Sequence, residues 1–163
     1  MTEDSATRLL VGWREWVALP DLGVRRIKAK MDTGARTSSL HAFQVETYSD
    51  GGAKRVRFGL HPRQGRNLPE KFFVSDVVEN RWVTDSGGHR ERRPVIATRI
   101  GIGELSWPIE LTLTDRDTMR FRLLIGRTAM HARLTVDPDA AYLMGKRRRI
   151  PKSRPLILRQ DSA

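Results

Sequence analysis

The sequence predicts an all-β domain, a small closed β-barrel with one short helix. Its 163 residues suffice for one domain with a sizeable core. Short apolar segments are separated by turns rich in glycine and aspartate, as in strands joined by hairpins. Two of these segments end in short motifs, Asp-Thr-Gly-Ala at Asp32–Ala35 and Gly-Arg at Gly126–Arg127, and the first occurs once in the chain. We expect this pair of motifs to form the functional site.

The first half of the chain predicts four strands. Val11–Leu19 and Val24–Met31 are the first two, and in the second of them apolar residues alternate imperfectly with Arg and Lys. A third strand, Leu40–Tyr48, leads into a turn at Asp50–Gly52, because consecutive glycines favour tight turns. A return strand around positions 56–58 completes this hairpin.

The second half predicts further strands and the short helix. The basic stretch His61–Glu70 contains glycine and proline and is expected to be a loop. The apolar strand Leu123–Ile125 ends in the Gly-Arg motif, and a short helix is expected at Thr128–Ala132. The other expected strands are 72–78, 81–84, 95–102 and 107–113.

Asp32, Thr33 and Gly34 form the candidate catalytic turn. Glycine in third place permits a tight turn that brings the backbone close to the Asp32 carboxylate. The Thr33 hydroxyl can donate or accept a hydrogen bond across an interface. This is the geometry that an aspartic peptidase needs, and the alternative is an Asx-type turn without a catalytic role.

The sequence resembles the retropepsin-like aspartic endopeptidases, the single-domain relatives of retroviral proteases. Those enzymes carry a hydrophobic-Asp-Thr/Ser-Gly-Ala turn in their first half and a hydrophobic-hydrophobic-Gly-Arg segment before a terminal helix. The chain is more closely similar to a bacterial branch that is often named "ATP-dependent zinc protease" and is linked with RimK-type ATP-grasp glutamate ligases. The closer resemblance rests on Val11–Trp16, Ala29–Ala42, Arg93–Ile96 and Glu110–Thr114.

This resemblance implies an aspartic endopeptidase that acts as a homodimer, since the chain carries one catalytic turn and is short for two aspartyl lobes. Two Asp32 carboxylates would meet across a twofold axis and share one proton, one acting as base and the other as acid. Thr33 of each chain would bridge to the partner. Ala35 and Arg36 would contact substrate. The structural second motif would consist of Ile125, Gly126 and Arg127.

The segment Thr84–Arg93 would be the flap that closes over substrate, judged by its place between the two motifs. Gly87 and Gly88 at its tip would let it open and close. Arg93 at its end is assigned to substrate binding with the two glycines. The alternative is an ordinary surface hairpin.

Arg36 departs from the retroviral pattern, which has an acidic residue directly after the turn. In the retroviral dimers that acid pairs with the arginine of the Gly-Arg segment, so Arg127 needs another partner, for which Glu15, Glu91 and Glu110 are candidates. A guanidinium group binds a carboxylate in a bidentate fashion, so Arg36 predicts a preference for acidic peptides, such as glutamate-extended protein tails. Structural pairing of Arg36 with a local Asp or Glu is the alternative.

The sequence predicts neither a metal site nor any other cofactor. The chain has no Cys and four His, which are few ligands for a catalytic zinc centre. His89–Glu91 comes nearest to a ligand pattern, but the arginines beside the glutamate disfavour a cation, and the histidines are expected on the surface or in the flap. No phosphate-binding loop of the Gly-x-x-x-x-Gly-Lys-Ser/Thr type occurs, and Gly101–Gly103 is interpreted as a strand turn.

The net charge of +11 is uneven along the chain. Residues 146–163 carry seven Lys or Arg against one Asp, which leaves +5 for the rest. We expect a flexible N-terminal tail at 1–9, the peptidase domain at 10–145 and a mobile basic tail at 146–163. This tail could bind an anionic surface such as RNA, although such runs are also common as solvated tails.

Two other function classes fit the sequence. A non-catalytic dimeric regulatory module would keep the fold without an active pair of carboxylates. A ribosome- or RNA-binding protein would use the basic tail and the aromatic residues Trp13, Trp16 and Trp82, which are instead expected in the core. The absence of cysteine, of a secretion signal and of a long apolar run predicts a cytoplasmic protein without membrane association.

Overall fold

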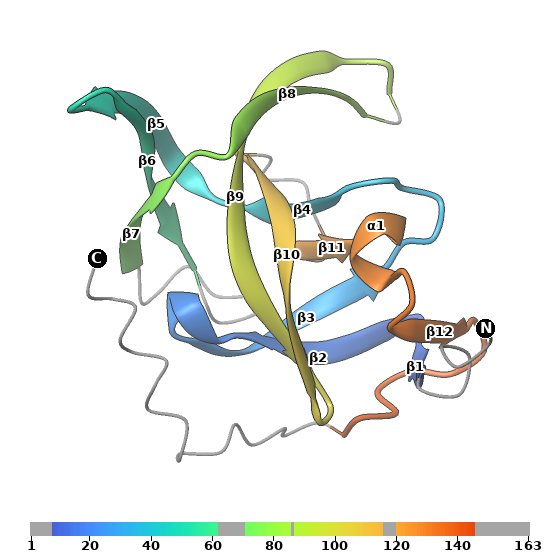
Figure 1. The fold of residues 1–163 in the computed structure, drawn as a ribbon. Helices are drawn as coiled ribbons and strands as arrows, with labels where there is room; N and C mark the ends of the chain where they lie inside the picture. Colours follow the sequence, from blue (N-terminus) through green and yellow to red (C-terminus); the bar gives the residue numbers. More distant parts are fainter. Residues whose placement is uncertain (1–7, 62–70, 86, 116–119, 146–163) are drawn as a thin grey trace.

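The computed structural model describes residues 8–61, 71–85, 87–115 and 120–145, most of them in β-strands (Figure 1). The elements of the first half are β1 (Leu9–Gly12), β2 (Arg14–Leu19), the 3-10 turn η2 (Pro20–Leu22), β3 (Val24–Met31), β4 (Ser38–His41), β5 (Phe43–Asp50) and β6 (Ala53–Leu60). Those of the second half are β7 (Lys71–Asp76), β8 (Glu79–Thr84), β9 (Arg90–Ile102), β10 (Leu105–Thr114), β11 (Leu123–Ile125), α1 (Arg127–Met130) and β12 (Leu134–Asp137).

Six strands close into a barrel. They pair in the order β10-β4-β11-β3-β2-β9, and β9 also pairs with β10, which closes the ring. The prediction of an all-β closed barrel with one short helix is therefore confirmed. β11 is inserted between β3 and β4, parallel to β3 and antiparallel to β4. Because β3 and β11 run in the same direction, the two sequence motifs that follow them become neighbours.

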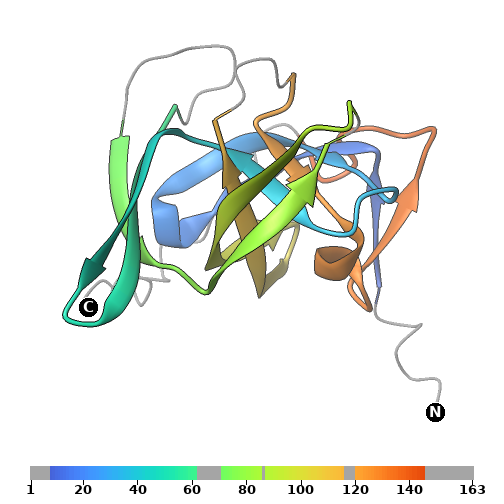
Figure 2. The same cartoon turned by 90° about the horizontal axis from the view of Figure 1, so that it is seen from above.

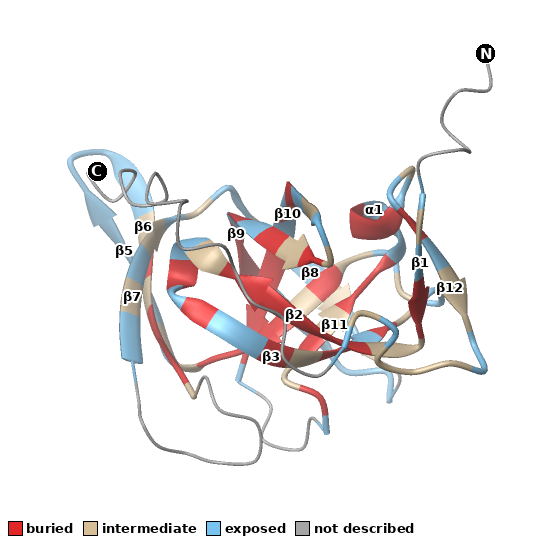
Figure 3. Cartoon of the chain, turned by 90° about the horizontal axis from the view of Figure 1, so that it is seen from below, coloured by how far each residue is buried: buried red, intermediate tan, exposed pale blue. Residues whose placement is uncertain are grey.

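Aliphatic side chains from all six barrel strands form the core, and the exposed residues lie outside it (Figure 3). In β3 the four apolar positions 24, 27, 29 and 31 are buried as predicted. The alternation is imperfect because the register between β2 and β3 shifts between Val17 and Leu19. One residue of β2 there, Ala18, opposes two of β3, a bulge that leaves both Arg25 and Arg26 exposed.

The predicted strand 11–19 is divided at Trp13. The Trp13 N–H donates to the carbonyl of Ala140 (2.8 Å), and β1 leaves the barrel to pair in parallel with β12. β12 has no counterpart among the predicted strands. Both differences arise from pairing between the two ends of the domain, which local alternation of apolar residues does not report.

The predicted strand 40–48 is divided at Ala42. The Ala42 N–H donates to the carbonyl of Thr114 (2.9 Å), and beyond this point β5 pairs with β6. Apart from His61, the predicted loop 61–70 lies outside the described residues. So do the basic tail and all but positions 8 and 9 of the N-terminal tail.

The smaller sheets lie at opposite ends of the barrel, β5-β6-β7 at one end and β1-β12 at the other, in both views (Figures 1 and 2). β8 pairs with the first half of β9 and extends the barrel sheet as a hairpin. This hairpin arches over the side of the barrel that carries β4 and α1 (Figure 1).

Candidate active site

The Asp-Thr-Gly-Ala loop follows β3 and is fixed by its own backbone. Gly34 N–H donates to Oδ1 of Asp32 (3.1 Å), and Ala35 N–H donates to the carbonyl of Asp32 (3.2 Å). Asp32 N–H donates to the carbonyl of Ile125 at the end of β11 (2.8 Å). Asp32 is half-buried, whereas Thr33 and Gly34 are exposed. The loop thus presents a carboxylate near the surface while its backbone is tied to the barrel.

The Gly-Arg segment holds the same loop from the other side. Arg127 N–H donates to the carbonyl of Ala35 (2.8 Å), and Nη1 of Arg127 donates to the carbonyl of Thr33 (3.1 Å). Thr128 donates to the carbonyl of Arg36 from its N–H (3.2 Å) and from its hydroxyl (2.9 Å). These four bonds clamp the loop to the start of α1.

Gly126 is required by a close approach of two backbones. A Cβ atom at this position would lie 2.4 Å from the carbonyl oxygen of Thr37. Gly126 N–H donates to the buried Ser38 hydroxyl (2.9 Å), and Ile125 is buried beside Met31. Residues 125–127 therefore pack directly against the segment that contains Asp32.

The partner of Arg127 is a backbone carbonyl rather than one of the three glutamates that the sequence suggested. Among the described residues, each of those glutamates is engaged elsewhere. Glu91 binds Arg93 and Glu110 binds Arg81. Glu15 is fully buried and accepts three backbone N–H bonds, from Gly12 (2.7 Å), Leu143 (2.8 Å) and Met144 (3.1 Å).

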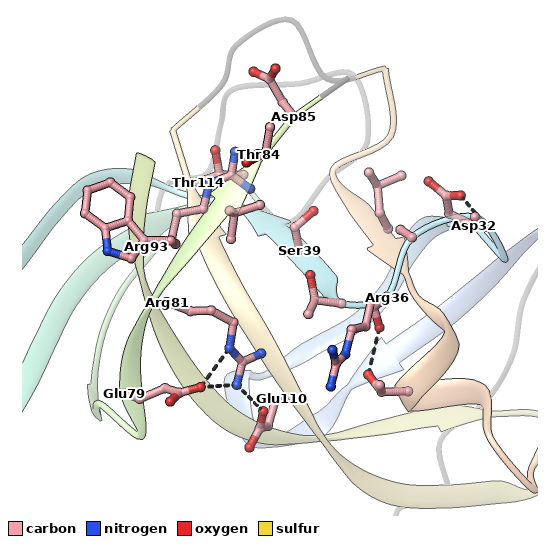
Figure 4. Close-up of a pocket in the computed structure, with 17 residues that line it drawn as sticks. Asp32, Arg36, Ser39, Glu79, Arg81, Thr84, Asp85, Arg93, Glu110 and Thr114 are labelled. Carbon is pink, nitrogen blue, oxygen red and sulfur yellow. Dashed lines mark hydrogen bonds and ion pairs between the residues drawn. The ribbon is translucent and has the colours of Figure 1, made fainter. Parts of the chain in front are cut away.

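A cleft of about 1120 Å³ lies between the β8–β9 hairpin and the barrel (Figure 4). It is lined by β8 and Arg93 on one side, by residues of β4, β10 and β11, and by the Asp32 loop. This volume exceeds that of a typical small-molecule site and suits several residues of an extended peptide. Of the predicted site residues, the lining includes Asp32, Gly34, Ala35, Arg36 and Arg93; it does not include Thr33, Gly87 or Gly88.

The two hairpin arginines in the cleft are already paired. Arg93 is 7% exposed, and its Nε donates to Glu91 (2.6 Å), so its charge is compensated within the protein. Arg81 donates from Nε to Glu79 (2.7 Å) and from Nη2 to Glu110 of β10 (2.9 Å), which joins the hairpin to the barrel (Figure 4).

The bonds of Arg81, that with Glu110 foremost, raise the pKa of its guanidinium above the usual value, although partial burial acts in the opposite direction. Arg81 is absent from the predicted site because Glu110 lies 29 residues further along the chain. A pair so far apart leaves no pattern in the local sequence.

Arg36 is the cleft cation for which the described part of the chain supplies no carboxylate. It is exposed, and its side chain points into the cleft (Figure 4). The structural pairing considered from the sequence is therefore not seen among the described residues. The whole lining carries three guanidinium groups against four carboxylates, those of Asp32, Glu79, Asp85 and Glu110. The cleft itself thus has no excess of positive charge.

The hairpin tip is organised around Asp85. Its Oδ1 accepts the N–H groups of Gly87 (2.8 Å) and His89 (2.9 Å), and Gly88 has a φ of +88° that favours glycine. Near the tip, Trp82 is 55% exposed and lies 4.6 Å from the Arg90 guanidinium. The expectation that Trp82 belongs to the core is wrong, because Trp82 lies in β8, the outermost strand of its sheet, and lines the cleft.

The histidines are distributed differently from the expectation. His89 and His131 are exposed, but His41 is buried at the end of β4, with its ring 6.5 Å from that of His61. Within the described ranges, no three His, Cys, Asp or Glu side chains gather as metal ligands would. The independence from metal stays a prediction. The same ranges contain no helix long and apolar enough to cross a membrane.

Comparison with known proteins identifies a family. A family model described as "RimB-like: Retropepsin-like aspartic endopeptidase RimB" matches residues 10–147. Proteins named "Probable alpha-L-glutamate ligase" from Parasynechococcus marenigrum and Shewanella pealeana are 44% and 42% identical over 85% and 88% of this chain. The chain spans only 30% and 31% of their lengths. A crystal structure of a Legionella pneumophila protein of unknown function superposes with a TM-score of 0.69 at 26% identity, covering 85% of this chain and 99% of that one.

Proposed function

The chain belongs to the RimB-like family of retropepsin-like aspartic endopeptidases, and we propose that it hydrolyses peptide bonds at an active site formed by two copies of the chain. The observation that carries the proposal is the clamped Asp32 loop at the edge of a cleft of peptide size. Backbone groups and Arg127 position this loop. The Gly34 N–H binds Oδ1 of Asp32, so Oδ2 is left for chemistry.

The dimer supplies the second carboxylate. Each chain has one Asp-Thr-Gly-Ala loop, and two Asp32 side chains at close range cannot both ionise, so the pair holds one proton. Exposure of Thr33 beside Asp32, outside the cleft lining, supports a contact between the two loops.

The chemistry follows from this shared proton. The ionised Asp32 takes a proton from a bound water, and the water oxygen attacks the carbonyl carbon of the peptide bond. The protonated Asp32 donates its proton to the carbonyl oxygen, which gives a neutral tetrahedral intermediate. When the C–N bond breaks, the protonated Asp32 donates to the amine nitrogen and the ionised Asp32 takes a proton from a hydroxyl of the intermediate, so the pair again holds one proton.

The decisive experiment is Asp32→Asn, assayed by mass spectrometry on a mixture of peptides, with sedimentation to measure oligomeric state. We expect a loss of cleavage of about 10²–10⁴-fold, the usual worth of a general acid–base group, in a protein that remains dimeric. Cleavage by the substituted protein, or a wild-type monomer at micromolar concentration, would contradict the proposal. A wild-type dimer that cleaves no peptide would indicate the non-catalytic module instead.

The substrate that we propose is an acidic peptide. The support is Arg36, for which the described residues supply no carboxylate, whereas Arg81 and Arg93 are neutralised by glutamates. A guanidinium group bonded to a substrate carboxylate contributes about 1.5–3 kcal/mol. Matched peptides with Glu or Gln near the scissile bond should therefore differ by about 10–100-fold in kcat/KM, and Arg36→Gln should abolish the difference.

Among acidic substrates, we propose glutamate-extended protein tails, and the names of the relatives support this choice. Those proteins are named as probable glutamate ligases, and a domain similar to this chain makes up about a third of each. We infer a functional link between this peptidase and an ATP-grasp glutamate ligase. The test compares one protein with and without an oligoglutamate tail; equal cleavage of both would remove the link while leaving the peptidase activity in place.

A further inference from the structure

β2 and β3 lie on the side of the barrel away from the β8–β9 hairpin (Figure 1). On their outer surface, cations lie over an aromatic ring. Arg14 is the cross-strand partner of Lys30, and Trp16 is that of Lys28, so these side chains project from one face. We call this surface the basic face. Its residues are Arg14, Trp16, Arg26, Lys28, Lys30 and Tyr142.

Aromatic rings hold the cations of the basic face in place. The Arg26 guanidinium lies 4.7 Å, and the Lys28 ammonium 5.4 Å, from the ring of Trp16. The ring of Tyr142 stacks on Trp16 at 6.1 Å and lies 5.0 Å from the Arg14 guanidinium. Trp16 is only 9% exposed because side chains of the basic face cover it. It does not belong to the cluster of side chains that forms the barrel core. Such cation–π contacts restrict long side chains before a ligand arrives.

Several polar groups of the basic face have no partner among the described residues. Nε of Arg14 and Nε1 of Trp16 are buried donors without an acceptor. No described carboxylate forms an ion pair with Arg14, Lys28 or Lys30, in contrast to the paired arginines of the cleft. Arg14, Lys28 and Lys30 therefore have no described carboxylate to neutralise them, and a ligand rich in anionic acceptor oxygens would supply that charge.

The basic face adds four cations to a domain that is itself positively charged. Residues 1–145 have a net charge of +5, with 23 Lys and Arg against 18 Asp and Glu. The run of basic residues that starts at Lys146 follows four positions after Tyr142, so charge of the same sign continues along the chain.

We propose that the basic face binds the phosphate backbone of a nucleic acid without reading its base sequence. Alternate residues of a strand project about 6.6 Å apart, which gives Arg26, Lys28 and Lys30 a regular spacing along β3. An exposed lysine gains only about 0–1 kcal/mol from a surface carboxylate, whereas each phosphate contact releases condensed counterions. This difference favours a nucleic acid over an acidic protein as the occupant.

The test measures binding of the full chain to an oligouridylate of about 20 nucleotides, and to a duplex of the same length, as salt is varied from roughly 50 to 300 mM. The variant is Lys28→Gln with Lys30→Gln. The control is Lys54→Gln with Lys71→Gln, which makes the same change of charge at exposed positions of β6 and β7. Both variants retain the basic tail, and their unfolding midpoints check that they fold.

Each lost phosphate contact lowers the slope of log K against log salt by about 0.7 on a single strand, so the variant should lose about 1.4 from its slope and bind about 25-fold more weakly at 0.1 M salt. The control should bind nearly as the wild type does. Equal losses in variant and control, or no binding by the wild type, would overturn the proposal. The proposal would also be overturned if the chain bound oligoglutamate more tightly than RNA and the Lys28→Gln, Lys30→Gln variant lost that binding.

Discussion

Replacement of Glu15 by glutamine should destabilise the domain by about 2–4 kcal/mol. The carboxylate is fully buried, with Oε2 bonded to Gly12 and Leu143 and Oε1 bonded to Met144. The lowest-energy arrangement of a glutamine places its NH2 group at the position of Oε1. There the NH2 group faces the Met144 N–H, a second donor, and the hydrogen bond from Met144 is lost. The unsatisfied donor costs about 1–3 kcal/mol, and each of the two remaining bonds loses about 1 kcal/mol when its acceptor becomes neutral. Relief of a buried charge offsets part of this sum.

Equilibrium unfolding in urea at fixed protein concentration measures the total effect, and hydrogen exchange of residues 140–145 measures where it acts. The matched control is Glu46→Gln, at an exposed position of β5, which should change stability by less than about 0.5 kcal/mol. Faster exchange should be concentrated at positions 142–144, since the Tyr142 N–H also bonds to Arg14 beside Glu15. A Glu15→Gln protein as stable as the control, with unchanged exchange at these positions, would refute the assignment of Glu15 as the anchor of this segment.

Three further outcomes test the site. Gly126→Ala should unfold the Asp32 loop or abolish the peptidase activity of the dimer, because the new Cβ would lie 2.4 Å from the carbonyl oxygen of Thr37. An active, equally stable variant would show that the two backbones can separate. Arg81→Gln should speed hydrogen exchange in β8 while lowering global stability by less than about 1 kcal/mol, since its ion pairs are partly exposed, and unchanged exchange would show that the Glu110 contact does not hold the hairpin. Peptidase activity should be unaffected by a strong chelator and by omission of nucleotide, and recovery of a lost activity with one equivalent of zinc would contradict this.

The local sequence pattern was sufficient to predict the structure wherever it depends on one strand and the turn that follows it. The bounds of β3 follow from its apolar positions. The Asp32 turn follows from Gly34, which allows the backbone to come close enough for its N–H to bond to the Asp32 carboxylate. The closed barrel and the single short helix were also accessible, through the pairing of the two motifs and the resemblance that they carry.

The remainder depends on contacts between distant segments. Trp13 and Ala42 end their strands because Ala140 and Thr114 capture their N–H groups. The Arg127 guanidinium bonds to a carbonyl, a group that every residue possesses, so no residue type in the sequence could identify its partner. Burial of Arg93 likewise depends on the packing of the folded domain, which its local sequence does not report.

The insertion of β11 between β3 and β4 determines when the Asp32 loop can be fixed in place during synthesis. β3 and β4 are close in sequence, but the strand that separates them is made almost a hundred positions later, together with the Gly-Arg segment that clamps the Asp32 loop. A chain that is still being synthesised therefore contains Asp32 without the support that fixes it. The contacts that fix the Asp32 loop arise only after nearly the whole domain has left the ribosome.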